Sequence, residues 1–238
     1  MNNGNEIKGI IFDYGGTIDS RGIHWSWVIW DGYKDAGVPI TLEQFREAYV
    51  YAERELARVR HILPQDDFHV LLSKKMAIEV GHLAEQGLVT GHWQATAQHI
   101  ADYCYRRTRE CIEEARPVLE KLSEHYPMML VSNFYGNVGS VLQDFGLRRY
   151  FRGIIESAVV GVRKPNPTLF RLGIDALELE PSQVLVVGDS LRKDILPAES
   201  LGCHTLWLKA RGWTPDEDAA THPGTITALT QVLPALGL

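Results

Sequence analysis

Cysteine is scarce in this 238-residue sequence, and the few cysteines present are not arranged for cross-linking. Cys104, Cys111 and Cys203 form no CxxC pair, and their number is odd. A disulfide scaffold and a structural zinc site are therefore not expected, and a reducing compartment fits this pattern best. Excess positive charge is also missing, since the formal net charge is -6 at pH 7. Because nucleic-acid binding favours a basic patch or stripe, we expect no nucleic-acid partner.

Long apolar stretches are absent as well. No run approaches the roughly 18 apolar residues that a membrane span needs. The first residues, MNNGNEIKGIIFD, lack the basic and apolar regions of a secretory signal peptide. We therefore expect no membrane partner and a cytoplasmic location. Hydrophobic residues still make up 45% of the chain, which is enough for one large domain or for a core with a smaller insert.

The chain instead contains short apolar runs of strand length. They are apolar on both faces, which is typical of parallel strands buried inside a sheet. Helical patterns lie between them, and this alternation predicts a doubly wound α/β fold with a mostly parallel sheet. The expected strands are 7–12, 128–131, 184–187 and 204–208, with 153–156 as a weaker fifth, and the expected helices are 117–126, 137–145, 167–177 and 192–201.

The stretch from about residue 24 to about residue 110 breaks this alternation. It shows helical periodicity, as in the stripe of Leu42, Phe45 and Tyr49, and no convincing strand. We therefore expect a helical insert over residues 23–110, between the first two core strands. The core domain would then consist of residues 1–22 and 111–238.

Polar side chains follow three of the expected strands. Asp13 follows the first, Ser132 and Asn133 follow the second, and Asp189 closely follows the third. In open α/β sheets, ligands bind in the crevice beyond the carboxyl ends of the strands. The pattern therefore predicts that these residues, far apart in sequence, converge on one site.

Asp13 lies in the segment IIFDYGGTIDS, next to Gly15 and Gly16. Glycines let backbone N–H groups turn toward an anion and let that anion approach closely. A carboxylate is also a competent nucleophile toward phosphorus, as in enzymes that form an aspartyl-phosphate. The alternative is a turn in which Asp13 only caps the following segment.

Two further carboxylates, Asp189 and Asp194, lie five residues apart in VLVVGDSLRKDI. Mg²⁺ takes hard oxygen ligands, usually one or two carboxylates together with waters and substrate phosphate. Asp13, Asp189 and Asp194 are therefore candidate metal ligands. The alternative is that Asp189 and Ser190 cap a helix whose first turn contains Asp194, and both interpretations can hold together.

Ser132 and Lys164 are candidates for binding a phosphoryl group. The Ser132 hydroxyl can donate to a phosphoryl oxygen, although it can also simply cap the next helix. Lys164, in the loop VRKPNP, can hold the nucleophilic carboxylate and neutralise a transferring phosphoryl group. By itself a surface lysine usually has no such role, so its interpretation depends on the other segments.

Taken together and in this order, the four segments resemble the motifs of the haloacid dehalogenase-like hydrolase superfamily. Asp13 in DYGGT matches the nucleophile, Ser132 the second motif, Lys164 in RKPNP the third, and GDSxxxD the acidic fourth. The resemblance covers roughly residues 5–20 and 112–238. The helical insert between the first two motifs resembles the C1-type cap of this superfamily.

The resemblance implies a Mg²⁺-dependent small-molecule phosphatase with an aspartyl-phosphate intermediate at Asp13. Its partner would be a small phosphorylated metabolite, and the protein would be a monomer or homodimer. Lys164 would act with Asp13 in catalysis. The groups implied to bind the phosphoryl oxygens are Ser132, Asn133 and the backbone near Gly15 and Gly16, and those implied to bind the metal are Asp13, the Gly15 carbonyl, Asp189 and Asp194.

Gly15 departs from the superfamily pattern. In the phosphatases that the sequence resembles, this position usually carries a second aspartate, which protonates the leaving group and then activates water. General acid–base catalysis is worth about 10²–10⁴-fold, so substrates with good leaving groups, such as acyl phosphates or sugar 1-phosphates, would suffer least. His24 and His61 are candidate replacements from the insert, although a lone histidine is more often structural or solvated.

Two other functions stay open because of this glycine. Relatives that cleave C–halogen or C–P bonds also lack the second aspartate, and the C–P enzymes need a lysine of the cap to form a Schiff base. Lys34, Lys74 and Lys75 are available, but nothing in the sequence singles one out. The second of these functions is that of a non-catalytic module that binds phosphate and metal.

The insert also contains aromatic and basic residues that could face a substrate. The spacing of Trp25, Trp27 and Trp30 puts them on different faces of a helix, so some would line a cleft and others would pack. The basic residues of the tract ERELARVRH either read substrate anions or form a solvated surface; they are Arg54, Arg58 and Arg60.

Overall fold

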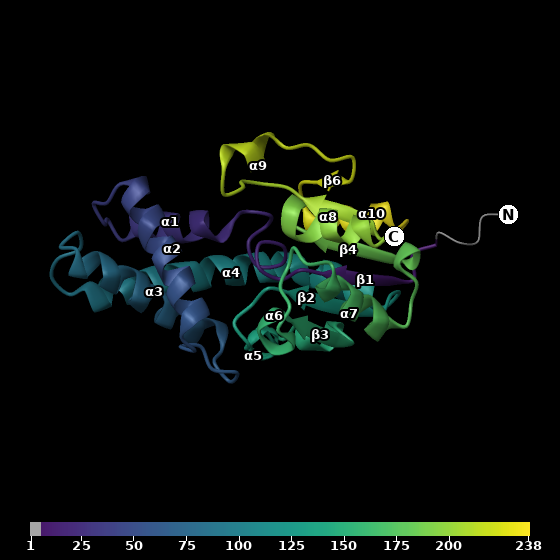
Figure 1. The fold of residues 1–238 in the computed structure, drawn as a ribbon, viewed down its shortest axis with the longest axis horizontal. Helices are drawn as coiled ribbons and strands as arrows, with labels where there is room; N and C mark the ends of the chain where they lie inside the picture. The colour runs from purple at the N-terminus through teal and green to yellow at the C-terminus, as the bar shows by residue number, and fades with distance from the viewer. Residues whose placement is uncertain (1–5) are drawn as a thin grey trace.

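Six parallel strands form one open sheet in the computed structural model, which describes residues 6–238 (Figure 1). The strand order is β3-β2-β1-β4-β5-β6. This confirms the doubly wound α/β fold and all five expected strands. The strands are β1 (Gly9–Phe12), β2 (Met128–Ser132), β3 (Gly153–Glu156), β4 (Val184–Gly188), β5 (His204–Leu208) and β6 (Thr225–Ile226).

Both faces of the sheet are covered, which explains why its strands are apolar throughout. Successive side chains of a strand point to opposite faces. Ile11 of β1 packs in one core cluster with residues of α7 (Thr168–Leu177) and α8 (Leu196–Ser200). Ile10 and Phe12 belong to the other cluster, which contains residues of α4 (Trp93–Ser123) and α5 (Val138–Asp144).

The insert is helical, as expected. It contains α1 (Trp25–Asp35), α2 (Leu42–Arg58), α3 (Phe68–Glu85) and most of α4. A capping box between Thr41 and Gln44 starts α2, and the Asp67 side chain caps α3. Figure 1 shows α1, α2 and α3 gathered to one side of the sheet, with α4 running from them back toward it.

The segment expected as a helix at 117–126 is helical through Ser123, but its expected start is wrong, because Pro117 lies inside α4 and does not begin a new helix. A proline inside a helix removes one backbone hydrogen bond. The buried stripe of Ile112, Ala115 and Leu119 continues past it and packs in the core, so tertiary burial overrides the local signal. The division into a core of residues 1–22 and 111–238 and an insert of residues 23–110 stays a prediction. Its second boundary, between residues 110 and 111, would fall within the continuous helix α4.

The helix expected at 192–201 is in fact two pieces. A π-helical turn at Leu191–Ile195 precedes α8, and the Ser190 hydroxyl caps this turn by accepting from the Lys193 N–H. The wide turn places Asp194 so that its Oδ2 accepts from the Ser190 N–H at 3.0 Å. The remaining short helices are α6 (Ser157–Val160), α9 (Pro215–Ala219) and α10 (Val232–Ala235), with 3₁₀ turns at Arg148–Tyr150, Pro181–Gln183 and Leu229–Gln231.

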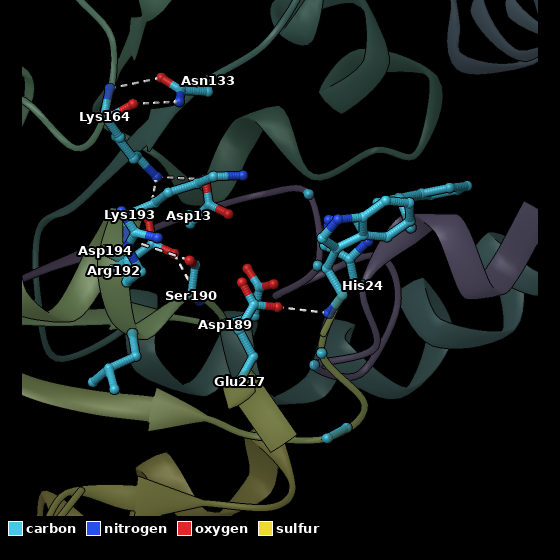
Figure 2. A pocket seen from close by; sticks show the side chains of 18 of the residues that line it. Asp13, His24, Asn133, Lys164, Asp189, Ser190, Arg192, Lys193, Asp194 and Glu217 are labelled. Carbon is cyan, nitrogen blue, oxygen red and sulfur yellow. Dashed lines mark hydrogen bonds and ion pairs between the residues drawn. The ribbon is translucent and has the colours of Figure 1, made fainter. Parts of the chain in front are cut away.

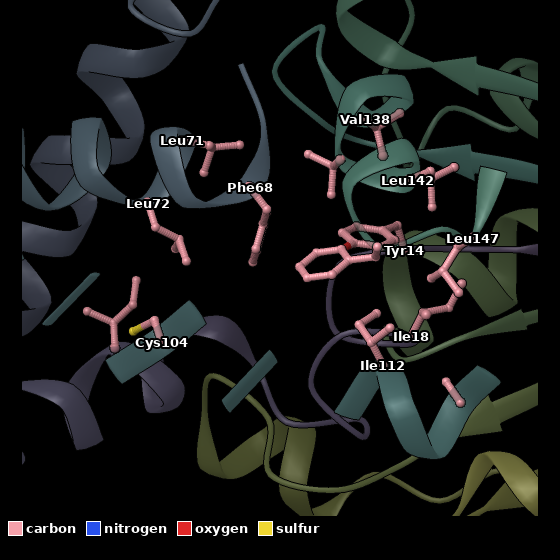
Figure 3. Packing of buried hydrophobic residues seen from close by; sticks show 14 of the residues in the cluster. Tyr14, Ile18, Phe68, Leu71, Leu72, Cys104, Ile112, Val138, Leu142 and Leu147 are labelled. Atoms are coloured by element: carbon pink, nitrogen blue, oxygen red, sulfur yellow. The ribbon is translucent and has the colours of Figure 1, made fainter. Parts of the chain in front are cut away.

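A continuous apolar core joins the sheet to the insert next to Asp13. Figure 3 shows Tyr14 between Phe68 of α3 and Val138 and Leu142 of α5. Tyr14 is fully buried, and its ring makes edge-to-face contacts with Phe68 and Phe134 at centroid distances of 6.2 and 5.6 Å. This packing holds the chain rigidly directly after Asp13. Within residues 6–238, no helix combines the length and apolar character needed to cross a membrane.

Candidate active site

Asp13, Lys164 and Asp194 meet beyond the carboxyl ends of β1 and β4, as the sequence predicted. The Lys164 ammonium donates to Asp13 Oδ1 at 2.7 Å and to Asp194 Oδ1 at 2.6 Å (Figure 2). All three side chains are buried. An ion pair of this kind is costly to bury unless its hydrogen bonds are well made, and here Lys164 bridges two carboxylates.

Asn133 holds the backbone of Lys164. Its amide nitrogen donates to the Lys164 carbonyl at 3.1 Å, and its amide oxygen accepts from the Lys164 N–H at 2.9 Å. This pairing links the end of β2 to the lysine loop and positions the ammonium. Direct contacts of Asn133 and Ser132 with a substrate stay predictions. Ser132 is buried at the end of β2 and does not line the cavity described below.

Asp189 approaches the glycine turn closely. Its Oδ1 accepts from the Thr17 hydroxyl at 3.2 Å, and its backbone carbonyl accepts from the Trp207 indole at 2.7 Å. Gly16 has φ +99°, and a Cβ at this position would lie 2.3 Å from an Asp189 oxygen. Only glycine fits here, because any side chain would collide with the carboxylate.

The site contains more negative than positive charge. Oxygen atoms of Asp13, Asp189 and Asp194 lie within 4.8 Å of one another, and Lys164 is the cation that contacts two of these residues. Burial raises the pKa of Asp189, and repulsion from Asp194 and Asp13 raises it further. Burial also raises the pKa of Asp194, although Lys164 opposes this. Burial lowers the pKa of Lys164, but attraction to Asp13 and Asp194 outweighs it and raises the pKa above its usual value.

This donor set suits a hard divalent cation. Three carboxylates within reach of one ion match the oxygen ligands that Mg²⁺ and similar ions prefer. A bound cation would relieve the repulsion that raises the carboxyl pKa values. The predicted carboxylate ligands are therefore brought together by the fold and could bind a metal ion.

Gly15 differs from Gly16 because the structure leaves room for a side chain there. A Cβ on Gly15 would meet nothing closer than the Trp25 indole at 3.9 Å, and its φ lies outside the left-handed region. Neither crowding nor backbone conformation therefore requires glycine at this position.

Asp19 is a residue of the site region that the sequence interpretation missed. Its carboxylate accepts from the Gly16 N–H at 2.7 Å and from the Trp25 indole at 3.0 Å, and burial raises its pKa to about 7. It does not line the cavity, so it stabilises the turn and does not face a ligand. The feature of the sequence that could have identified Asp19 is its position six residues after Asp13, in the segment that leads from the first strand into a loop.

A cavity of about 710 Å³ lies against Asp13, between the sheet and the insert. Trp25 lines it, whereas Trp27 donates from its indole to the Gly212 carbonyl and Trp30 packs on Phe45. The expected arginines of the tract ERELARVRH do not line it. Its cationic lining comes instead from Lys75 and from core loops, through Arg163, Lys164, Arg192, Lys193, Lys209 and Arg211.

Of the two histidines considered as proton donors, only His24 lines the cavity. Burial and, to a smaller extent, the nearby Lys193 together lower its pKa to about 4, so its imidazole is neutral at pH 7. A neutral imidazole suits proton acceptance better than donation. His61 lies outside this cavity and contacts Glu55 at 3.0 Å.

Comparison with known proteins places this arrangement in a family. The model of the haloacid dehalogenase-like hydrolases matches residues 7–202. The chain therefore belongs to this family of hydrolases, which confirms the resemblance carried by the four motifs.

Among its curated relatives are two phosphatases. Phosphoglycolate phosphatase of Yersinia pseudotuberculosis is 32% identical over 60% of this chain and 65% of its own length. Phosphoserine phosphatase of Thermus thermophilus is 32% identical over 39% of this chain and 37% of its own length. A mouse haloacid dehalogenase-like hydrolase domain-containing protein 3 is also 32% identical, over 47% of this chain and 45% of its length. The chain thus spans less than two thirds of each of these relatives.

Solved structures with the same fold include both hydrolases and dehalogenases. The Bacillus subtilis HAD-hydrolase YfnB, solved bound to magnesium, superposes with a TM-score of 0.61 at 20% identity, over 98% of this chain and all of that one. The L-2-haloacid dehalogenase PA0810 gives a TM-score of 0.62 at 18% identity, over 97% of this chain and all of that one. These likenesses confirm the fold.

Proposed function

We propose that this protein is a Mg²⁺-dependent phosphatase that hydrolyses a small phosphorylated metabolite through an aspartyl-phosphate at Asp13. The observation that supports this most strongly is the contact between Asp13 and Lys164 within the three-aspartate cluster, at one side of the cavity. Curated relatives named as phosphatases support the same reaction class. The three cysteines are free and buried, which agrees with the reducing cytoplasm that we propose as its location.

In the proposed first step, an Asp13 carboxylate oxygen bonds to phosphorus while the bond to the leaving oxygen breaks. Lys164 holds the carboxylate and offsets the negative charge of the phosphoryl group. Backbone N–H groups near Gly15 and Gly16, together with Ser132 and Asn133, are the proposed phosphoryl contacts. The Gly16 N–H would have to leave the Asp19 carboxylate, to which it donates in this structure. In the second step water attacks phosphorus and the bond to Asp13 breaks.

The proposed metal ligands are the Asp13, Asp189 and Asp194 carboxylates and the Gly15 carbonyl. A Mg²⁺ ion bound there would screen the negative charges that Asp13 and a phosphate ester bring together. No carboxylate stands at position 15 to protonate the leaving group, so substrates whose leaving group needs no proton should react fastest.

The experiment is an acetyl phosphate assay with purified protein, with and without Mg²⁺, beside the Asp13→Asn variant. Acetyl phosphate has a good leaving group, so the missing acid does not mask activity. We expect Mg²⁺-dependent phosphate release that the variant loses. Release that survives in Asp13→Asn would exclude Asp13 as the nucleophile.

Two alternatives make different predictions in the same assay. A dehalogenase would release halide from 2-haloacids without Mg²⁺, and a binding module would bind phosphate with no turnover. A phosphonatase needs a lysine with a free amine, but Lys75, the candidate that lines the cavity, is ion-paired with Glu53. Burial lowers its pKa, yet the attraction of Glu53 outweighs this and raises the pKa well above its usual value. That pairing disfavours Schiff base formation.

A further inference from the structure

A second polar cluster lines the cavity on the side of the insert. Lys75 of α3 is ion-paired with the Glu53 carboxylate of α2, and the Tyr135 hydroxyl donates to the two oxygens of that carboxylate at 3.0 and 3.3 Å. All three residues line the cavity that also contains Asp13. The cluster joins two helices of the insert to the loop after β2, and the proposed chemistry does not use it.

The cluster presents its carboxylate to the cavity and keeps its ammonium behind it. The Lys75 side chain is 5% exposed, whereas that of Glu53 is 35% exposed. The Lys75 ammonium also lies 4.8 Å from the centre of the Tyr49 ring, which shields it on another side. Glu53 is therefore held in one orientation by two donors, with lone pairs left for a donor from a ligand.

Aromatic side chains also line the cavity that this carboxylate faces. Among them are Trp25, Phe68, Phe134 and Trp213, and the Trp25 and Phe68 rings meet edge to face at 5.5 Å. A cavity of about 710 Å³ is within the range of roughly 300–1,000 Å³ that holds drug-sized ligands. A two- or three-carbon phosphate ester would leave most of this apolar surface uncovered, so the lining suits a larger leaving group with a flat, apolar body.

We propose, on the basis of the phosphatase function above, that among phosphate monoesters of alcohols, whose leaving oxygens all need a proton, the preferred substrate has a leaving group that carries an aromatic heterocycle with an N–H donor. The ring lies against the aromatic lining, and its N–H donates to the Glu53 carboxylate. A carboxylate accepting from an exocyclic amine is an established mode of base recognition, and bases stack on aromatic side chains. Nucleoside monophosphates are the probes of this class.

The test compares cytidine 5′-monophosphate with phosphoglycolate and acetyl phosphate, using the full chain with Mg²⁺. We expect kcat/KM for the nucleotide to exceed that for phosphoglycolate by about tenfold or more. Glu53→Gln should lower the ratio of kcat/KM for the nucleotide to that for acetyl phosphate by about tenfold. The matched control is Glu55→Gln, on the same helix but outside this cavity, and it should leave that ratio unchanged.

Binding provides a second readout that does not need turnover. The Kd for cytidine 5′-monophosphate is measured by titration of the Asp13→Asn protein. Adding Glu53→Gln to this protein should raise the Kd about tenfold. Adding Tyr135→Phe should raise it less, because Tyr135 acts only by orienting Glu53. A melting curve for each variant confirms that it is folded.

The failures of the two proposals differ. If acetyl phosphate is hydrolysed but phosphoglycolate is preferred to the nucleotide, or if Glu53→Gln changes neither the ratio nor the Kd, the substrate class is wrong while the phosphatase function holds. If acetyl phosphate is not hydrolysed, the proposed function fails, and the nucleotide titration alone then decides whether the subsite exists.

Discussion

Substituting aspartate for Gly15 would supply the group that the first motif lacks. The structure has space for it, since the new Cβ would lie 3.9 Å from the Trp25 indole and would need no unusual φ. Gly15 lines the same cavity as Asp13 and Asp189, so the new carboxyl would share that cavity with them. Like charges raise the pKa of a carboxyl group, so the two aspartates would favour the protonated form, which can donate a proton.

The size of the gain depends on the leaving group. General acid catalysis is worth about 10²–10⁴-fold. We expect Gly15→Asp to recover part of it, about 10-fold or more in kcat, for alkyl phosphates, whose leaving oxygen needs a proton. Acetyl phosphate should gain much less, because acetate leaves without protonation.

The assay is steady-state phosphate release across aryl and alkyl phosphates with leaving groups of increasing pKa. Wild type should show a steep fall in rate along this series, and Gly15→Asp a shallower one. Gly15→Asn is the matched control, with the same shape and no acidic proton. A folded Gly15→Asp protein that binds Mg²⁺ but shows no gain on alkyl phosphates beyond that of Gly15→Asn would refute the reasoning.

The remaining predictions concern charge and crowding. Lys164→Met should lower kcat by at least about 10²-fold and destabilise the metal-free protein by about 3–5 kcal/mol, because buried carboxylates lose their cation; calorimetry should show Mg²⁺ recovering part of this stability. Gly16→Ala should abolish Mg²⁺ binding measured by calorimetry or unfold the turn, since its Cβ would collide with Asp189; unchanged binding would contradict the geometry. Burial raises the pKa of the fully buried Glu79 to about 8. The folded state therefore keeps a proton that the unfolded state loses above about pH 4.5, and stability falls by up to about 1.4 kcal/mol per pH unit between those values. Denaturant titrations at pH 5 and pH 8 give the free energy of unfolding at each pH. Its decrease between these values should be smaller for Glu79→Gln than for the wild-type protein, and an equal decrease would exclude Glu79 as the cause.

The core of the site could be predicted because it depends on the ends of buried parallel strands. Such strands are recognisable as runs that are apolar on both faces, and residues that follow them converge on the same edge of the sheet. Asp13, Ser132, Asn133 and Asp189 were found in this way, whereas the interpretation of Lys164, in the loop VRKPNP, depended on these other segments. By contrast, β6 has two residues, one of them exposed, so its sequence has no periodic pattern to recognise.

The wall of the cavity on the insert side could not be predicted in the same way. Glu53 and Lys75 lie on different helices, and no spacing in the sequence shows that these helices pack with the two side chains facing each other. The basic tract containing Arg54 and Arg58 left anion binding and a solvated surface both open, and neither arginine lines the cavity. Helical periodicity identifies a buried face but does not show which residues meet across helices.

The most direct test of the central claim is to trap the phosphoryl group on Asp13. Acid quenching of a reaction with radiolabelled acetyl phosphate and Mg²⁺, followed by peptide mapping, reports where the label sits. We expect an acid-stable, hydroxylamine-sensitive label on the peptide containing Asp13, absent from the Asp13→Asn protein. Phosphate release with no label at Asp13, under conditions that trap other acyl phosphates, would contradict it.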